Sequence, residues 1–192
     1  MRTAELNRKT NETDITLKIN LDGSGKANVS TGIAFFDHML TSFARHSGFD
    51  LDIVAKGDIE VDCHHTVEDV GIVLGECIRR AAADKVGIER FWDCSVPMDE
   101  SLAFAALDAG GRAFLCYSAE FTYQMCGEFE TAMAEEFFRA LAFGSACALH
   151  VKLLTGSNDH HRLEAIFKAV ARCYGKAYAV TGSAVPSTKG CI

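Results

Sequence analysis

One short pattern occurs twice in this chain, and its residue types are those that bind metal ions. The pattern is two adjacent histidines followed three residues later by a glutamate, and it comprises His64, His65 and Glu68 in the first copy and His160, His161 and Glu164 in the second. Imidazole and carboxylate ligands without thiolate suit zinc, manganese or iron. A single copy would more often be a helix cap or a surface feature, but its repetition favours metal binding.

Each copy begins a segment with helical periodicity. The apolar stripes comprise Val67, Val70, Leu74 and Ile78 in the first segment and Leu163, Ile166, Val170 and Tyr174 in the second. At about 100° per residue, the first histidine and the glutamate of each copy lie together beside this stripe, and the second histidine points about 100° away. Each helix therefore offers two ligand directions, and two such helices can hold two ions between them.

The other predicted elements also occur twice. Residues 14–21 alternate as a strand, residues 22–25 form a turn, and residues 27–31 form a second strand, followed by a helix over 34–46, a strand over 49–54 and the first motif helix, which ends near residue 87. A strand-turn-strand unit over 102–117, a helix over 131–146, a strand over 148–154 and the second motif helix repeat this order. We predict an α+β fold with internally duplicated halves, approximately 1–90 and 91–192, in a single domain. The halves should share one core, with the helices packed together and the sheets on one side.

The duplication pairs His38 with Glu136. His38 precedes the first motif by 26 residues and Glu136 precedes the second by 24, and this alignment also matches Leu51 with Leu149. Each metal site can therefore take one further ligand from the earlier helix of a half. A solvated position on the helix is the alternative interpretation of Glu136.

Composition limits the classes of function. The 192 residues carry a net charge of −7, which argues against a protein-wide nucleic-acid surface. The start has no apolar run of a secretory signal and no stretch is long enough to span a bilayer, so we expect a cytoplasmic protein. The eight cysteines form no C-x-x-C pair and are expected to be reduced, buried small side chains.

These motifs resemble the imidazoleglycerol-phosphate dehydratase family over essentially the whole chain. The matching segments are residues 7–13, 36–40, 62–69, 98–100, 136–138, 158–161, 164–169 and 186–190. The resemblance implies the ribosomal protein S5 domain 2-like fold, in which each half is a small sheet with two helices. It also implies the conversion of D-erythro-imidazole glycerol phosphate to imidazole acetol phosphate and water in L-histidine biosynthesis.

The resemblance further implies two Mn²⁺ ions per active site that bind the two ring nitrogens of the substrate and stabilise an imidazolate. The implied ligands are His38, His64, His65, Glu68, His160, His161 and Glu164, with Glu136 as an eighth. How they divide between the two ions stays open. Many family members carry histidine at Glu136, and the usual serine is replaced here by Gly110, where we expect a changed turn.

The remaining implied roles are acid/base chemistry and binding of the substrate. Glu12 resembles the family acid/base residue that is presented across a subunit contact, and Asp99 and His46 are weaker candidates for proton transfer or hydroxyl contact. The implied phosphate pocket comprises Arg90, Arg112, Lys168, Ser187, Thr188 and Lys189. The family also implies a homo-oligomer of 24 subunits built from trimers. The alternatives are a binuclear metallohydrolase and a metal-dependent assembly or storage protein.

Overall fold

The computed structural model describes residues 1–192, and the two halves contain the same elements in the same order. The first half consists of β1 (Thr3–Lys9), β2 (Thr13–Asn20), β3 (Ala27–Ser30), α1 (Ala34–Ser47), β4 (Asp50–Gly57) and α2 (His64–Ala82). The second consists of β5 (Phe91–Met98), β6 (Ser101–Asp108), β7 (Phe114–Ser118), α3 (Met133–Gly144), β10 (Ala148–Thr155) and α4 (Asp159–Ala177). A short hairpin, β8 (Met125–Cys126) and β9 (Phe129–Glu130), precedes α3.

The two sheets have the same topology and register. Their strand orders are β1-β2-β4-β3 and β5-β6-β10-β7, and in each the last strand is parallel to its neighbour while the other pairs are antiparallel. Ile53 pairs with Leu17 in the first sheet, and Val151 pairs with Ala105 in the second. The predicted duplicated α+β fold is therefore confirmed.

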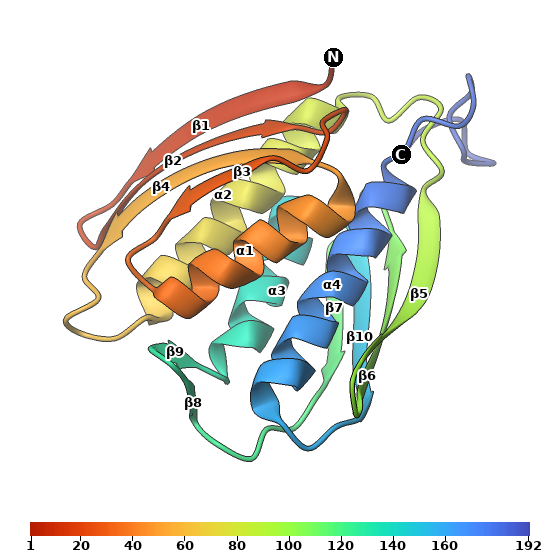
Figure 1. Ribbon diagram of the computed structural model, residues 1–192. Coiled ribbons are helices and arrows are strands. Elements are labelled where there is room, and N and C mark those ends of the chain that lie inside the picture. The colour runs from red at the N-terminus through yellow and green to blue at the C-terminus, as the bar shows by residue number, and fades with distance from the viewer.

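The four helices lie between the two sheets, as Figure 1 shows. We expected the sheets on one side, and this was wrong. Each sheet has one apolar face, which its own two helices cover, and the helices then pack across the halves as the pairs α1–α4 and α2–α3. The resulting core contains 49 buried residues from both halves, so the two helix pairs position the metal-motif residues within one packed body.

The structure differs from the sequence expectation in three respects. The first strand of each half was missed, because β1 has no fully buried side chain and β5 carries Pro97 and the exposed Phe91 and Trp92. The strands β2 and β3 do not form a hairpin, since β4 lies between them. Helix α2 ends at Ala82 rather than near residue 87, because the next residue has a positive φ of 51°.

Both motifs begin in the first turn of a helix. In α4, the side chain of Asn158 caps the helix and accepts hydrogen bonds from the backbone N–H groups of His160 and His161. In α2, Asp62 accepts a hydrogen bond of 2.8 Å from the backbone N–H of His64. These side chains fix where each helix begins and so fix the direction of its histidines. None of the four helices is both long and apolar enough to cross a membrane.

Candidate metal centre

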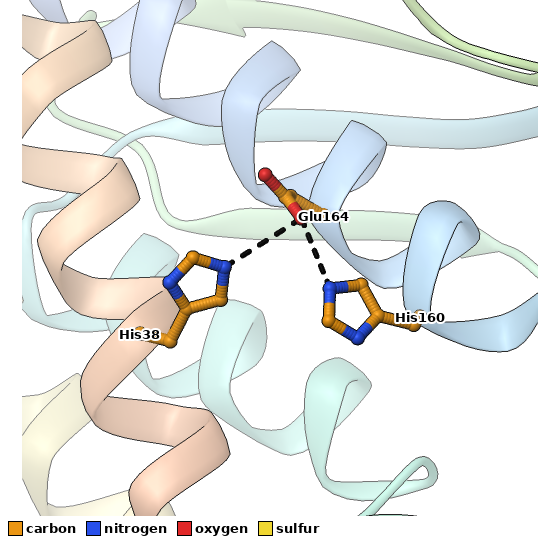
Figure 2. A group of neighbouring side chains, drawn as sticks. All are labelled: His38, His160 and Glu164. Carbon is orange, nitrogen blue, oxygen red and sulfur yellow. Dashed lines mark hydrogen bonds and ion pairs between the residues drawn. The ribbon is translucent and has the colours of Figure 1, made fainter.

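Helices α1 and α4 bring three ligand-type side chains together. His38 from α1 and His160 and Glu164 from α4 place their nearest ligand atoms within 4.8 Å of one another. The distance from Glu164 Oε2 is 3.1 Å to His160 Nε2 and 3.6 Å to His38 Nε2. Figure 2 shows both rings turned toward this carboxylate from different helices. We call these residues the first triad.

Glu164 is the buried member of the first triad. Only 8% of the residue is exposed, and its second oxygen, Oε1, lies 2.8 Å from Lys168 Nζ. Burial opposes ionisation of this carboxyl, but the hydrogen bond and charge of Lys168, together with the neighbouring histidines, outweigh it and lower its pKa. The carboxylate is therefore ionised and holds one oxygen toward the two imidazoles.

The equivalent residues of the other helix pair form an open arrangement. The strand register makes Leu51 equivalent to Leu149, and the same offset of 98 residues makes His38 of α1 equivalent to Glu136 of α3. His64 Nε2 lies 3.8 Å from Glu68 Oε2. Glu136 instead lies 3.5 Å from Arg139, one turn further along its own helix, so this carboxylate does not close a triad with His64 and Glu68.

The second histidine of each motif is held by a carboxylate through its Nδ1 atom. His65 Nδ1 lies 3.0 Å from Asp58 Oδ2, and His161 Nδ1 lies 2.8 Å from Glu100 Oε2. Hydrogen bonds to these carboxylates raise the pKa of both histidines above the ordinary value. Sequence reasoning missed Asp58 and Glu100, although each lies in a turn that carries other motif residues.

The two candidate acid/base residues lie near the other ring nitrogen of these histidines. Glu12, in the turn between β1 and β2, is 3.8 Å from His65 Nε2. Asp99, in the turn between β5 and β6, is 3.8 Å from His161 Nε2 and has a positive φ of 49°. The structure therefore brings Glu12 and Asp99 into the same relation to the two motifs.

Part of the candidate phosphate pocket continues from the first triad along α4. Lys168 and Arg172 follow Glu164 at successive four-residue intervals and so lie on one line of α4. His46 is in the last turn of α1. Partial burial, followed by the charges of Lys168 and Arg172, lowers its pKa. Arg172 was not among the residues singled out from the sequence.

The other phosphate candidates lie at the opposite end of α4. Arg90 forms an ion pair of 2.7 Å with Asp108 and donates a hydrogen bond of 2.8 Å to the carbonyl of Pro186. Its backbone N–H bonds to the carbonyl of Ala177, the last residue of α4. The same end carries Arg112 and the C-terminal segment, which includes Ser187, Thr188 and Lys189. With a rise of about 1.5 Å per residue, this end is about 25 Å from His160, so one chain does not bring all the predicted residues together.

Comparisons with known proteins identify the family of this chain. A family model described as imidazoleglycerol-phosphate dehydratase matches residues 31–174. The chain is 54% identical to the imidazoleglycerol-phosphate dehydratase of Acetivibrio thermocellus, covering 100% of this chain and 99% of that protein. It is 51% identical to the one from Methanosarcina barkeri, covering 100% of each. The crystal structure of imidazoleglycerol-phosphate dehydratase from Staphylococcus aureus matches with a TM-score of 0.84 and 36% identity, covering 94% of this chain and 99% of that one. The chain therefore belongs to the imidazoleglycerol-phosphate dehydratase family.

Proposed function

We propose that this chain is the hydro-lyase that converts D-erythro-imidazole glycerol phosphate to imidazole acetol phosphate and water in L-histidine biosynthesis, with two Mn²⁺ ions per active site. The observation that carries the proposal is the first triad. Two imidazole nitrogens and one ionised carboxylate converge there from two helices, next to a lysine that can attract an anionic substrate.

The donor set of the first triad fits a divalent first-row metal ion. Such ions bind nitrogen and oxygen at roughly 2.0–2.2 Å, so neighbouring ligand atoms in tetrahedral or octahedral sites are roughly 2.8–3.6 Å apart. The observed separations of 3.1 and 3.6 Å from Glu164 Oε2 fall in this range. The absence of thiolate and the presence of carboxylate support manganese over softer metals.

The pseudo-equivalent residues supply the second proposed site. His64 and Glu68 already lie on one line of α2, and a change of side-chain rotamer at Glu136 would release this carboxylate from Arg139 toward them. We propose that Glu136 ligates, so that the two ions divide the ligands as His38, His160 and Glu164 for one and His64, Glu68 and Glu136 for the other. His65 and His161 would complete the two ligand sets through their Nε2 atoms.

When bound, the two ions would supply Lewis-acid stabilisation of the negative charge that develops on the substrate ring. The chain itself supplies groups that move protons. Glu12 is our proposed acid/base residue, because its exposed carboxylate lies beside a second-position histidine and has no other side-chain partner. Asp99 occupies the corresponding place in the other half and is the second candidate.

The separation of the cations supports an assembly of several copies. Lys168 and His46 adjoin the first triad, but Arg90, Arg112, Ser187, Thr188 and Lys189 lie at the far end of α4. A distance of about 25 Å along the helix is much longer than the three-carbon side chain that joins the phosphate to the ring. We therefore propose that a neighbouring copy supplies the second group of cations, within the 24-subunit homo-oligomer of trimers that the family implies.

We further propose that residues 1–192 form a single domain, with pseudo-repeat halves near 1–90 and 91–192. We also propose that the protein is located in the cytoplasm. All eight cysteines are free thiols, which is compatible with a reducing compartment. Light scattering of the purified protein would measure the assembly directly, and a monomer at micromolar concentration that turns over substrate would contradict the shared phosphate pocket.

Turnover of imidazole glycerol phosphate tests the function. Metal-stripped wild-type protein should be inactive and should recover on addition of Mn²⁺, whereas His160→Ala should stay inactive in Mn²⁺. The matched control is His150→Ala, which removes an exposed histidine from the outer face of the second sheet and should retain wild-type activity. Release of inorganic phosphate without dehydration would instead favour a metallohydrolase.

A further inference from the structure

The turn glutamates of the two halves are equivalent in position but have different partners. Ile15 of β2 pairs with Ala55 of β4, and the equivalent Ala103 of β6 pairs with Leu153 of β10. Lys9 pairs with Asp14 across the first turn, and Pro97 pairs with Leu102 across the second. This register makes Glu12 of the first half equivalent to Glu100 of the second. If the halves worked identically, both glutamates would contact their motif histidine in the same way.

In the second half, both oxygens of Glu100 are engaged. Oε2 accepts a hydrogen bond of 2.8 Å from His161 Nδ1. Oε1 accepts hydrogen bonds of 3.0 and 2.8 Å from the backbone N–H groups of Ser157 and Asn158, at the start of α4. An ionised carboxylate is only an acceptor, so His161 carries a proton on Nδ1, and in the neutral imidazole Nε2 then keeps a free lone pair.

In the first half, a different residue performs this role. Asp58, just after β4, has its carboxylate oxygens 3.0 and 3.2 Å from His65 Nδ1, and this carboxylate accepts no other hydrogen bond. Glu12 is left on the opposite side of the ring, 3.8 Å from Nε2. In the first half, Asp58 therefore makes the contact with Nδ1 that Glu100 makes in the second, and Glu12 does not make it.

The second half has no room for a counterpart of Asp58. The equivalent position, 98 residues later, is Gly156, where φ is +151°. A Cβ at this position would lie 2.5 Å from Ser101 Oγ and 2.8 Å from Arg162 Cγ. A side chain there would have to displace Ser101 or Arg162, and in this half the turn glutamate holds His161 Nδ1 instead.

We propose that Asp58 and Glu100 are positioning residues that hold His65 and His161 with the proton on Nδ1 and Nε2 free to bind a metal ion. This difference makes the two halves unequal. In the first half the turn glutamate, Glu12, lies beside Nε2 of its histidine, whereas in the second half the preceding turn residue, Asp99, lies there instead. This inference rests on the proposed metal centre. Partners of ligating histidines commonly fix the tautomer in this way.

The two amide substitutions should behave differently, and this difference makes the test sharp. In Glu100→Gln, the backbone N–H groups of Ser157 and Asn158 require the amide oxygen, so the NH₂ group faces His161 Nδ1 and selects the tautomer with the proton on Nε2. In Asp58→Asn, no other donor competes for the amide oxygen, so it can turn toward His65 and preserve the tautomer. A merely structural role would predict no such contrast between near-isosteric changes.

The experiment measures Mn²⁺ affinity and stoichiometry by equilibrium dialysis of the assembled wild type and both variants, with the visible absorption spectrum of the Co²⁺-loaded proteins as a second readout. We expect Glu100→Gln to weaken one of the two ions about 10- to 100-fold and to change its Co²⁺ spectrum, with the melting temperature of the metal-free protein unchanged. Asp58→Asn should stay within about threefold of wild type, whereas Asp58→Ala should lose affinity as Glu100→Gln does.

Three results would each overturn this inference alone. Glu100→Gln could keep the wild-type Mn²⁺ affinity and Co²⁺ spectrum, or Asp58→Asn could lose as much Mn²⁺ affinity as Glu100→Gln. The third is a lower melting temperature of metal-free Glu100→Gln that accounts for its loss of affinity. Wild-type protein that binds no Mn²⁺ would overturn the proposed function and this inference with it. The two failures are therefore distinguishable.

Discussion

Substitution of Gly75 by alanine should selectively disturb the second metal site. Gly75 lies where α2 crosses α3, and a Cβ there would be 2.6 Å from the carbonyl oxygen of Leu141 and 2.8 Å from both Gly144 Cα and Ser145 N. All three atoms belong to the backbone, so no change of rotamer relieves the overlap, and the helices must move apart. The second proposed site lies across the same helix pair, with Glu68 about 10 Å from Gly75 along α2, whereas the first lies across α1 and α4.

The cost of Gly75→Ala follows from two opposing effects. Overpacking costs about 1–3 kcal/mol, and the rigid backbone contacts place this site in the upper half of that range. Alanine recovers about 1 kcal/mol through its higher helix propensity. We therefore expect a net loss of about 1–2 kcal/mol in the free energy of unfolding, which lowers the melting temperature by roughly 2–8 °C.

Circular dichroism melting and Mn²⁺ titration would measure both effects. The control is Gly182→Ala, where the nearest atom to a new Cβ is 4.0 Å away, and which should stay within about 0.5 kcal/mol of wild type. We expect Gly75→Ala to weaken one ion and leave the other at wild-type affinity. A melting temperature equal to that of the control, or an equal loss at both ions, would refute the reasoning.

Three further predictions concern the rest of the chain. Asp50 accepts two backbone hydrogen bonds that lower its pKa. Its contribution to stability is therefore present above about pH 4 and is lost as the pH falls through the lowered pKa. In urea titrations, the free energy of unfolding of Asp50→Asn should fall less steeply with decreasing pH than that of wild type, and an equal fall would contradict this. Asp108→Asn removes the charge partner of Arg90, which also donates a hydrogen bond to the C-terminal segment. We expect the free energy of unfolding to fall by about 1.5–3 kcal/mol and trypsin to remove that segment faster. A wild-type cleavage rate would contradict the role of Arg90 in holding the segment. A hydrogen bond from the Cys173 thiol lowers the pKa of Cys94 to about 7. The rate of its alkylation by iodoacetamide, followed by mass spectrometry, should therefore rise steeply between pH 6 and 8, in proportion to the thiolate fraction. A rise only above pH 8 would contradict the lowered pKa.

The sequence predicted those features that depend on local pattern. The helical phase of the two motifs placed His160 beside Glu164, and the spacing of the halves paired His38 with Glu136. The same pattern could not reveal which helices cross, because the contact of α1 with α4 depends on packing between the halves. It therefore left the division of the ligands open.

Features that depend on long-range geometry could not be predicted from the sequence. The strands β1 and β5 lack a continuous apolar face because they are edge strands of their sheets, so their alternation is weak. Asp58 and Glu100 are ordinary acidic turn residues by spacing, and only the folded turns bring them to Nδ1 of the motif histidines. The difference between the halves is therefore visible only in three dimensions.

The most direct test of the metal centre is a crystal structure of the Mn²⁺-loaded protein with anomalous diffraction measured at the manganese edge. We predict two anomalous peaks for each chain, one bound by His38, His160 and Glu164 and the other by His64, Glu68 and Glu136. Metal-free crystals provide the control. A single peak, or peaks that lie away from the first triad, would contradict the proposed division of ligands between the two helix pairs.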